Sequence, residues 1–61
     1  MLKLFIETGN AAFDDEPATE LARILETLAA RIRDNGPETY VILRDYNGNK
    51  VGEAQFSESG Q

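Results

Sequence analysis

The run from Asp45 to Asn49 has the residue types and spacing with which a calcium-binding loop begins. Its letters, DYNGN, place carboxylate and amide oxygens at alternate positions. Such a loop also needs glycine at its sixth position and a bidentate glutamate at its twelfth, where this chain has Lys50 and Phe56. A lysine side chain would occupy the space that the ion requires. We therefore interpret the run as a β-turn and predict no metal site.

Catalytic residue types are scarce in this chain. Cysteine and histidine are both absent, which excludes thiolate nucleophiles, histidine bases, disulfides and thiolate or imidazole metal sites. Ser57 and Ser59 lie in a polar tail without a neighbouring base, and no glycine-rich phosphate-binding run is present. With 61 residues there is also little room for an enclosed pocket. We expect a protein that is not an enzyme and uses no cofactor.

Acidic residues gather where a helix is expected to begin, immediately before Pro17. Carboxylates at this end of a helix cap free N–H groups and meet the positive end of the helix dipole, which alone explains their position. Alternatively, they bind a basic partner or a hard cation. For the partner-binding role we select Asp14, Asp15, Glu16 and Glu20, with Glu38, Asp45 and Glu53 as further acids.

The composition restricts the class of partner. Eleven acidic and six basic residues give a net charge of −5, the wrong sign for a protein that grips nucleic-acid phosphates, so direct nucleic-acid binding is not expected. A negative surface instead suits a protein, or a protein–nucleic-acid complex, with a basic surface, although such charge also serves solubility alone. No apolar run approaches the length of a membrane span, and the lack of cysteine favours the cytoplasm.

Hydrophobic periodicity predicts three strands and one helix within a single domain, residues 1–61. Residues 2–8 alternate between apolar and polar side chains, which is typical of a half-buried strand. A helix then runs from Pro17 to Asn35-Gly36-Pro37, with Gly36 at a positive φ, and Glu20 falls on its exposed side. The predicted core-facing stripe consists of Leu21, Leu25, Leu28 and Ile32, widened by Ala18, Ala22, Ile24 and Ala29.

The last third of the chain predicts a β-hairpin of residues 39–45 and 50–56, followed by a frayed tail, residues 57–61. Asn47-Gly48 favours a two-residue type I′ turn, in which both residues have a positive φ. This turn pairs Leu43 with Gly52, Val41 with Ala54 and Thr39 with Phe56 on the face that meets the helix. The other face then carries Tyr40, Ile42 and Arg44 opposite Gln55, Glu53 and Val51.

The expected fold is α+β in the order β-α-β-β, a three-stranded sheet with one helix packed on one face. The first two strands run parallel through a right-handed crossover, and the third lies between them, antiparallel to both, or at an edge. The uncovered face carries Phe5, Tyr40, Ile42 and Val51. This face is either a partly wetted sheet or an interface. For the interface role we select Tyr40 and Ile42, and we favour a homodimer over a foreign partner.

Three stretches carry a resemblance: ETGNAAF at 7–13, ELARIL at 20–25 and LRDYNGNKVG at 43–52. In them the chain resembles a group of small prophage-encoded proteins of proteobacteria. The stretches are structural motifs, so the resemblance implies a fold and a genomic origin and transfers no site residue. Small, acidic, cysteine-free phage proteins include many anti-CRISPR inhibitors, and this chain is similar to that class in size and charge.

The leading hypothesis is a phage-type inhibitor that binds a host defence complex, most concretely an anti-CRISPR protein that occupies a basic nucleic-acid-binding groove. The alternative is a non-enzymatic prophage accessory or assembly protein that homodimerises through its open sheet face. The placement of the acids distinguishes them, because charge that mimics nucleic acid should form one continuous patch.

Overall fold

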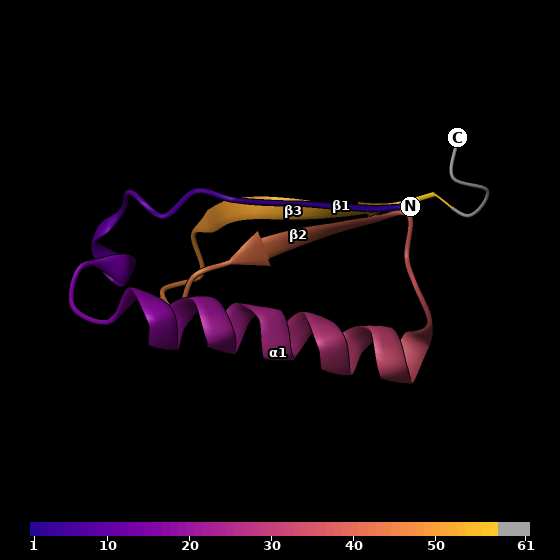
Figure 1. Ribbon diagram of the computed structural model, residues 1–61, viewed down its shortest axis with the longest axis horizontal. Helices are drawn as coiled ribbons and strands as arrows, with labels where there is room; N and C mark the ends of the chain where they lie inside the picture. The colour runs from indigo at the N-terminus through magenta and orange to yellow at the C-terminus, as the bar shows by residue number, and fades with distance from the viewer. Residues whose placement is uncertain (58–61) are drawn as a thin grey trace.

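The computed structural model describes residues 1–57 and shows one helix lying across one face of a sheet (Figure 1). Along the chain the elements are β1 (Leu2–Ile6), the short 3-10 helix η1 (Ala11–Phe13), α1 (Pro17–Asn35), β2 (Tyr40–Arg44) and β3 (Lys50–Phe56). The predicted α+β class is confirmed, and η1 is an addition to it. The expected frayed tail lies outside the described residues except for Ser57, whose N–H donates to the carbonyl of Met1.

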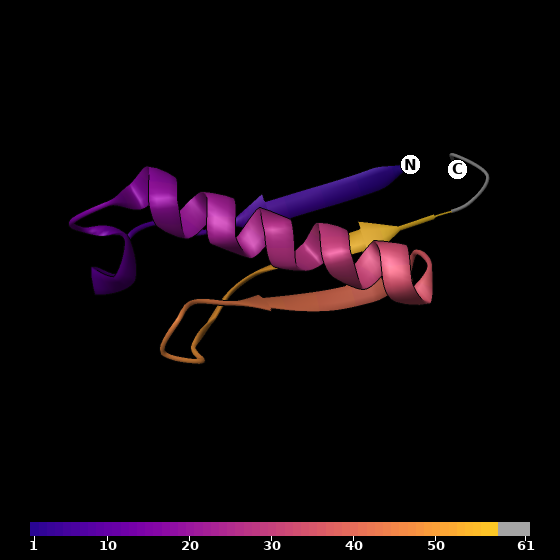
Figure 2. The ribbon, with the colours of Figure 1, turned by 90° about the horizontal axis from the view of Figure 1, so that it is seen from below.

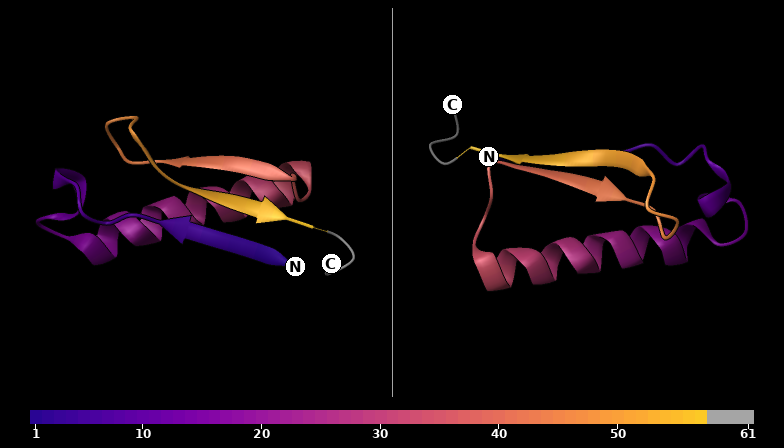
Figure 3. Two further views of the ribbon diagram at one scale, coloured as in Figure 1. Left: turned by 90° about the horizontal axis from the view of Figure 1, so that it is seen from above. Right: turned by 180° about the vertical axis from the view of Figure 1, so that it is seen from behind.

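β3 is the central strand of the sheet, whose order is β1-β3-β2. It runs antiparallel to both neighbours, so β1 and β2 are parallel to each other without touching (Figure 3). This is one of the two arrangements that the sequence left open. The predicted pairs of Leu43 with Gly52 and Val41 with Ala54 are confirmed. Their side chains meet the helix, and Val41, Leu43 and Ala54 are buried.

Backbone hydrogen bonding, and not side-chain capping, defines the ends of α1. Glu16 is the N-cap residue but its carboxylate makes no capping bond; it accepts instead from the Thr19 hydroxyl at 2.9 Å. Pro17 occupies the first turn, where its missing N–H leaves no bond unmade. At the other end Gly36 has φ 78°, and its N–H donates to the carbonyl of Ile32 at 2.8 Å. The expected positive φ at Gly36 is therefore confirmed.

The face of α1 that meets the sheet differs from the predicted stripe. Its buried residues are Glu20, Ile24 and Leu28, four residues apart, while Leu21 and Ile32 are only partly buried and Leu25 is exposed. The predicted stripe is confirmed for Ile24 and Leu28. It is wrong for its exposed members and for Glu20, because apolar type was taken to mean burial and charge to mean exposure; the exposed members are Ala18, Ala22, Leu25 and Ala29. The core consists of Ala12, Phe13, Ile24, Leu28, Val41, Leu43, Val51 and Ala54.

The hairpin loop also differs from the prediction. Gly48 has φ 87°, but no residue other than glycine has a positive φ within residues 1–57, so a type I′ turn at Asn47-Gly48 is wrong. The loop has three residues, 46–48, closed by hydrogen bonds from Gly48 N–H to Asp45 O and from Asp45 N–H to Asn49 O, each 2.9 Å. The longer loop shifts the pairing, so that Arg44 lies opposite Lys50. A bulge then restores the register and turns Val51 into the core, which removes Val51 from the open face.

Candidate binding surfaces

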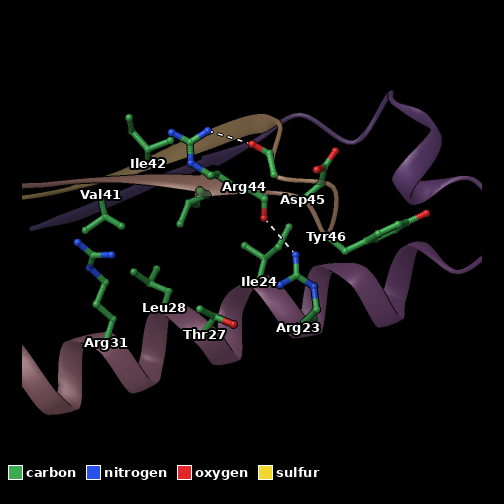
Figure 4. A pocket seen from close by; sticks show the side chains of 12 residues that line it. Arg23, Ile24, Thr27, Leu28, Arg31, Val41, Ile42, Arg44, Asp45 and Tyr46 are labelled. Carbon is green, nitrogen blue, oxygen red and sulfur yellow. Dashed lines mark hydrogen bonds between the residues drawn. The ribbon is translucent and has the colours of Figure 1, made fainter.

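The start of α1 presents an exposed acidic surface. Asp14, Asp15 and Glu16 are exposed, and none of them takes part in an ion pair within residues 1–57. Asp15 and Glu16 line a shallow hollow of about 260 Å³, which we call the acidic hollow, together with the exposed Tyr46. Figure 4 shows the ring of Tyr46 extending toward the beginning of α1. Two carboxylates beside an aromatic ring suit an ammonium or guanidinium group.

Tyr46 is not among the predicted binding residues, because the DYNGN run was interpreted as a turn. A tyrosine between Asp45 and Asn47, at the tip of a polar hairpin loop, has no neighbouring apolar positions with which to form a core. Its exposure could therefore have been anticipated. Its position beside Asp15 and Glu16 could not, because the fold of the loop over the helix start sets that contact.

Glu20 is buried, which contradicts its assignment to an exposed binding surface. Arg23 donates to both oxygens of its carboxylate, from Nε to Oε1 at 2.8 Å and from Nη2 to Oε2 at 2.9 Å. The Tyr46 N–H also donates to Oε2, at 2.9 Å. The hydrogen bonds from Arg23 lower the pKa of Glu20; burial opposes them and the bond from Tyr46 adds to them. Glu20 therefore fastens the hairpin loop to α1, and its charge is satisfied internally.

Asp45 is buried as well and is not available as a further acid for a partner. Its Oδ1 accepts from the N–H groups of Asn47 and Asn49, both at 2.9 Å, and its Oδ2 accepts from the side chains of Asn10 at 2.9 Å and Asn49 at 3.3 Å. Burial by itself raises the pKa of Asp45, but the bonds from Asn49, Asn10 and Asn47 outweigh it and hold that pKa below its ordinary value. Donors thus occupy both oxygens, and no acidic cluster within residues 1–57 is placed to hold a metal ion.

The two remaining acids lie far from the start of α1. Glu38 follows the other end of the helix, where Arg31 donates to both its oxygens at 2.9 and 3.1 Å and thereby lowers the pKa of Glu38. Glu53 lies on β3, where the Tyr40 hydroxyl donates to it at 2.8 Å and the Lys50 ammonium lies 3.6 Å away. The predicted acids therefore do not form one continuous patch. Of the seven predicted acids, only Asp14, Asp15 and Glu16 combine exposure with freedom from ion pairs among residues 1–57.

The open sheet face carries the predicted Phe5, Tyr40 and Ile42, all exposed. Phe5 on β1 and Ile42 on β2 both pair with Glu53, so a carboxylate lies between them on the central strand. Gln55, the next residue of β3 on this face, donates to Glu53 at 3.3 Å. The face therefore has exposed apolar side chains on both edge strands and polar side chains along its centre, and it offers no continuous apolar surface.

A groove of about 420 Å³ runs between α1 and β2, and it contains most of the arginine side chains (Figure 4). Arg23 Nη2 donates to the carbonyl of Arg44 at 3.1 Å, and Arg44 Nη1 donates to the carbonyl of Gly48 at 3.0 Å. Arg31 is engaged by Glu38. Arg23 thus joins the helix to β2, and each of the three arginines already has an acceptor within the fold.

Comparison with known proteins identifies no relative of this chain: no protein-family model matches it, and no curated protein or solved structure shows a significant match. Within residues 1–57, no helix is long and apolar enough to cross a bilayer. Function must therefore be inferred from the surfaces of the chain itself.

Proposed function

We propose that this protein is a small non-catalytic inhibitor of phage type that binds a basic surface of a host defence complex in the cytoplasm. In its most concrete form the protein is an anti-CRISPR that occupies a basic nucleic-acid-binding groove. The biological setting rests on the resemblance to small acidic prophage proteins. The binding chemistry rests on the acidic hollow, which is the observation that carries the proposal.

The acidic hollow is suited to a basic side chain because its charges are not neutralised within the fold. Each ion pair in the described chain involves Glu20, Glu38 or Glu53, so Asp15 and Glu16 keep their full attraction for a partner. An arginine or lysine that enters between them also contacts the ring of Tyr46, and such cation–π contacts contribute about 0.5–1 kcal/mol at exposed sites. The net charge of −5 adds a long-range attraction that accelerates association with a basic surface.

A plaquing assay in a bacterium with active CRISPR immunity tests the proposal. The wild-type protein should restore plaquing of a targeted phage, and the double substitution Asp15→Asn, Glu16→Gln should weaken this effect. The amides keep polar groups at the helix start while they remove two charges, so the variant should remain folded. Tyr46→Leu, which removes the aromatic ring and its hydroxyl, tests the ring separately.

The matched control is the pair Tyr40→Ser and Ile42→Ser on the open sheet face. Once the partner has been isolated, the charge variant should lose association rate more than it gains dissociation rate, and raised salt should reproduce its effect. Full activity of the charge variant together with loss of activity in the sheet-face variants would exclude the acidic hollow as the binding site.

The alternative function is a prophage accessory or assembly protein that homodimerises through the open sheet face. The exposure of Phe5, Tyr40 and Ile42 favours it as a second candidate. Glu53 argues against this particular surface, because face-to-face packing would bury its carboxylate between Phe5 and Ile42. The sheet-face variants described above also test this alternative, since they should then dissociate a dimer.

A further inference from the structure

β1 exposes apolar side chains on the face of the sheet that α1 covers elsewhere. Leu2 and Leu4 are 51% and 44% exposed, although the residue opposite Leu4 on β3, Ala54, is buried. Figure 2 shows the reason: α1 crosses the sheet obliquely, close to the end of β1 and away from its beginning. The first half of β1 is therefore left without a covering element in the described chain.

The flank of α1 on the same side is apolar too. Thr27 lines the groove toward β2, and helical periodicity places Leu25 on the opposite flank, which faces β1. Leu25 is 41% exposed. A hollow of about 260 Å³ lies between the start of β1 and the second half of α1. Its lining includes Leu2, Leu28, Ile32 and Phe56. We call Leu2, Leu4 and Leu25 the β1 flank.

The backbone of β1 is also open to a partner. Glu7 N–H donates to Val51 O at 2.7 Å and Ser57 N–H donates to Met1 O at 2.9 Å, so odd-numbered residues turn their backbone groups toward β3. Because the direction alternates along an antiparallel strand, Leu2, Leu4 and Ile6 direct theirs outward. β1 is an edge strand, and no described residue pairs with this outer side.

The other edge strand, β2, is protected. Arg23 donates to the outward carbonyl of Arg44, and the hairpin bulge disturbs the ladder at the same end of β2. The α1 side chains that line the groove between α1 and β2 lie against this edge (Figure 4). Such devices are the usual means by which proteins prevent unwanted strand pairing. β1 shows neither of them, although it carries one lysine, Lys3.

We propose that a second copy of this chain binds the β1 flank, with the two β1 strands antiparallel across a two-fold axis. The two three-stranded sheets then become one continuous sheet, and both helices lie on the same side of it. Leu4 of each copy lies next to the axis, and Leu2 and Leu25 lie further out on the same, helix-covered side of the joint sheet. This inference does not depend on the proposed inhibitor function, because the acidic hollow and the β1 flank share no residue.

Charge complementarity fixes the register. Outward-facing even residues must pair with even residues, so the axis passes through Lys3, Leu4 or Phe5. An axis at Lys3 opposes two lysines, which is unfavourable, and an axis at Leu4 places Lys3 opposite Phe5 and forms no ion pair. An axis at Phe5 places Lys3 of each copy opposite Glu7 of the other, which gives two ion pairs. It also brings the two exposed Phe5 rings side by side. Neither Lys3 nor Glu7 has an ion pair within residues 1–57, so both are available to the second copy. On the helix-covered side, Leu4 would face Ile6 of the second copy.

Cysteine cross-linking tests the contact directly, because the chain has no cysteine of its own. In the proposed register the two Phe5 residues form a non-hydrogen-bonded pair with Cα atoms about 4.5 Å apart, which is within disulfide range. Phe5→Cys should therefore form a disulfide-linked dimer under mild oxidation, at least about tenfold faster than the controls Leu4→Cys and Ile42→Cys. Faster linking of Leu4→Cys would refute the register, and faster linking of Ile42→Cys would assign the dimer to the open sheet face.

Sedimentation equilibrium of the cysteine-free chain supplies the second measurement. Lys3→Glu replaces both attractive pairs with repulsive ones and should weaken dimerisation about tenfold, which corresponds to about 1.4 kcal/mol. The double exchange Lys3→Glu, Glu7→Lys should restore it. Both residues are exposed, so their replacement leaves the fold of the protomer intact. A wild-type chain that remains monomeric at about 1 mM, where even weak specific dimers assemble, would overturn the inference.

Discussion

Gly52 holds β1 against the central strand, and its replacement by alanine provides a direct test of the described packing. A Cβ atom at this position would lie 1.9 Å from the carbonyl oxygen of Phe5 and 2.8 Å from its carbon. Both atoms belong to the backbone of β1, so no side-chain rotation relieves the clash. Because Cβ contacts are rarely shorter than 3.0 Å, β1 must move away by about 1 Å or more, which breaks ordinary hydrogen bonds of about 2.9 Å.

The expected loss of stability follows from the bonds that are broken. Roughly two or three backbone hydrogen bonds next to Gly52, at about 1 kcal/mol each, together with the displacement of Ile6, give about 3 kcal/mol. This loss is comparable to the whole stability of a domain of this size, which is about 3–5 kcal/mol. Gly52→Ala should therefore lower the midpoint of thermal unfolding by about 12–24 °C. Circular dichroism melts at fixed protein concentration provide the measurement.

Gly9→Ala is the matched control. Its Cβ would lie 3.9 Å from the Glu7 carboxylate, an ordinary contact, and Gly9 has no positive φ. The control should be neutral or slightly stabilising, because alanine reduces the freedom of the unfolded chain. Similar midpoints for the two variants would refute the close approach of β1 to β3.

Two further predictions concern the hairpin loop and the buried glutamate. Gly48→Ala should cost about 1–2 kcal/mol because φ is 87° there, whereas Asn47→Ala should cost clearly less because Asn47 has no positive φ; equal costs in urea melts would restore the two-residue turn. The pKa of Glu20 is lowered in the folded state, so between its folded and unfolded pKa values the folded state binds fewer protons. Its contribution is complete above the unfolded pKa of about 4.3 and is lost as the pH falls through the lower folded value. Glu20→Gln should therefore flatten the loss of stability that occurs as the pH falls below about 4.3, which acid unfolding followed by circular dichroism measures.

The sequence predicted those parts of the fold that depend on local chemistry. Pro17 and Gly36 mark the ends of α1 because each residue type has a backbone preference that few other residues share. The pairs of Val41 with Ala54 and Leu43 with Gly52 followed from the position of the turn. The loop length was predicted wrongly, because the expected two-residue turn and the observed three-residue loop both end in a glycine with a positive φ. One extra loop residue produced the bulge that buries Val51.

The candidate sites were harder to predict because burial of a charged residue depends on distant partners. Glu20 was assigned to solvent because Glu is a charged residue, yet Arg23 and the backbone of Tyr46 complete its hydrogen bonds inside the protein. Asp45 was likewise assigned to the surface, yet it is buried, and Asn10, 35 residues earlier in the chain, donates to its carboxylate. Asp15 and Glu16 are exposed, and they form no local ion pair because no basic residue follows them at helical spacing.

The central position of β3 determines the order in which the sheet can form as the chain is synthesised. β1 and β2 contact β3 but not each other, and β3 is the last of the three strands to be synthesised. The sheet cannot form until residues 50–56 have left the exit tunnel, so β1 and β2 emerge as unpaired apolar strands. The β2–β3 hairpin closes over a short loop and forms first, whereas Leu2 must find Phe56 across nearly the whole chain. Assembly of the sheet therefore follows the synthesis of residues 50–56, and β1, the strand proposed to join two copies, is the last to be added.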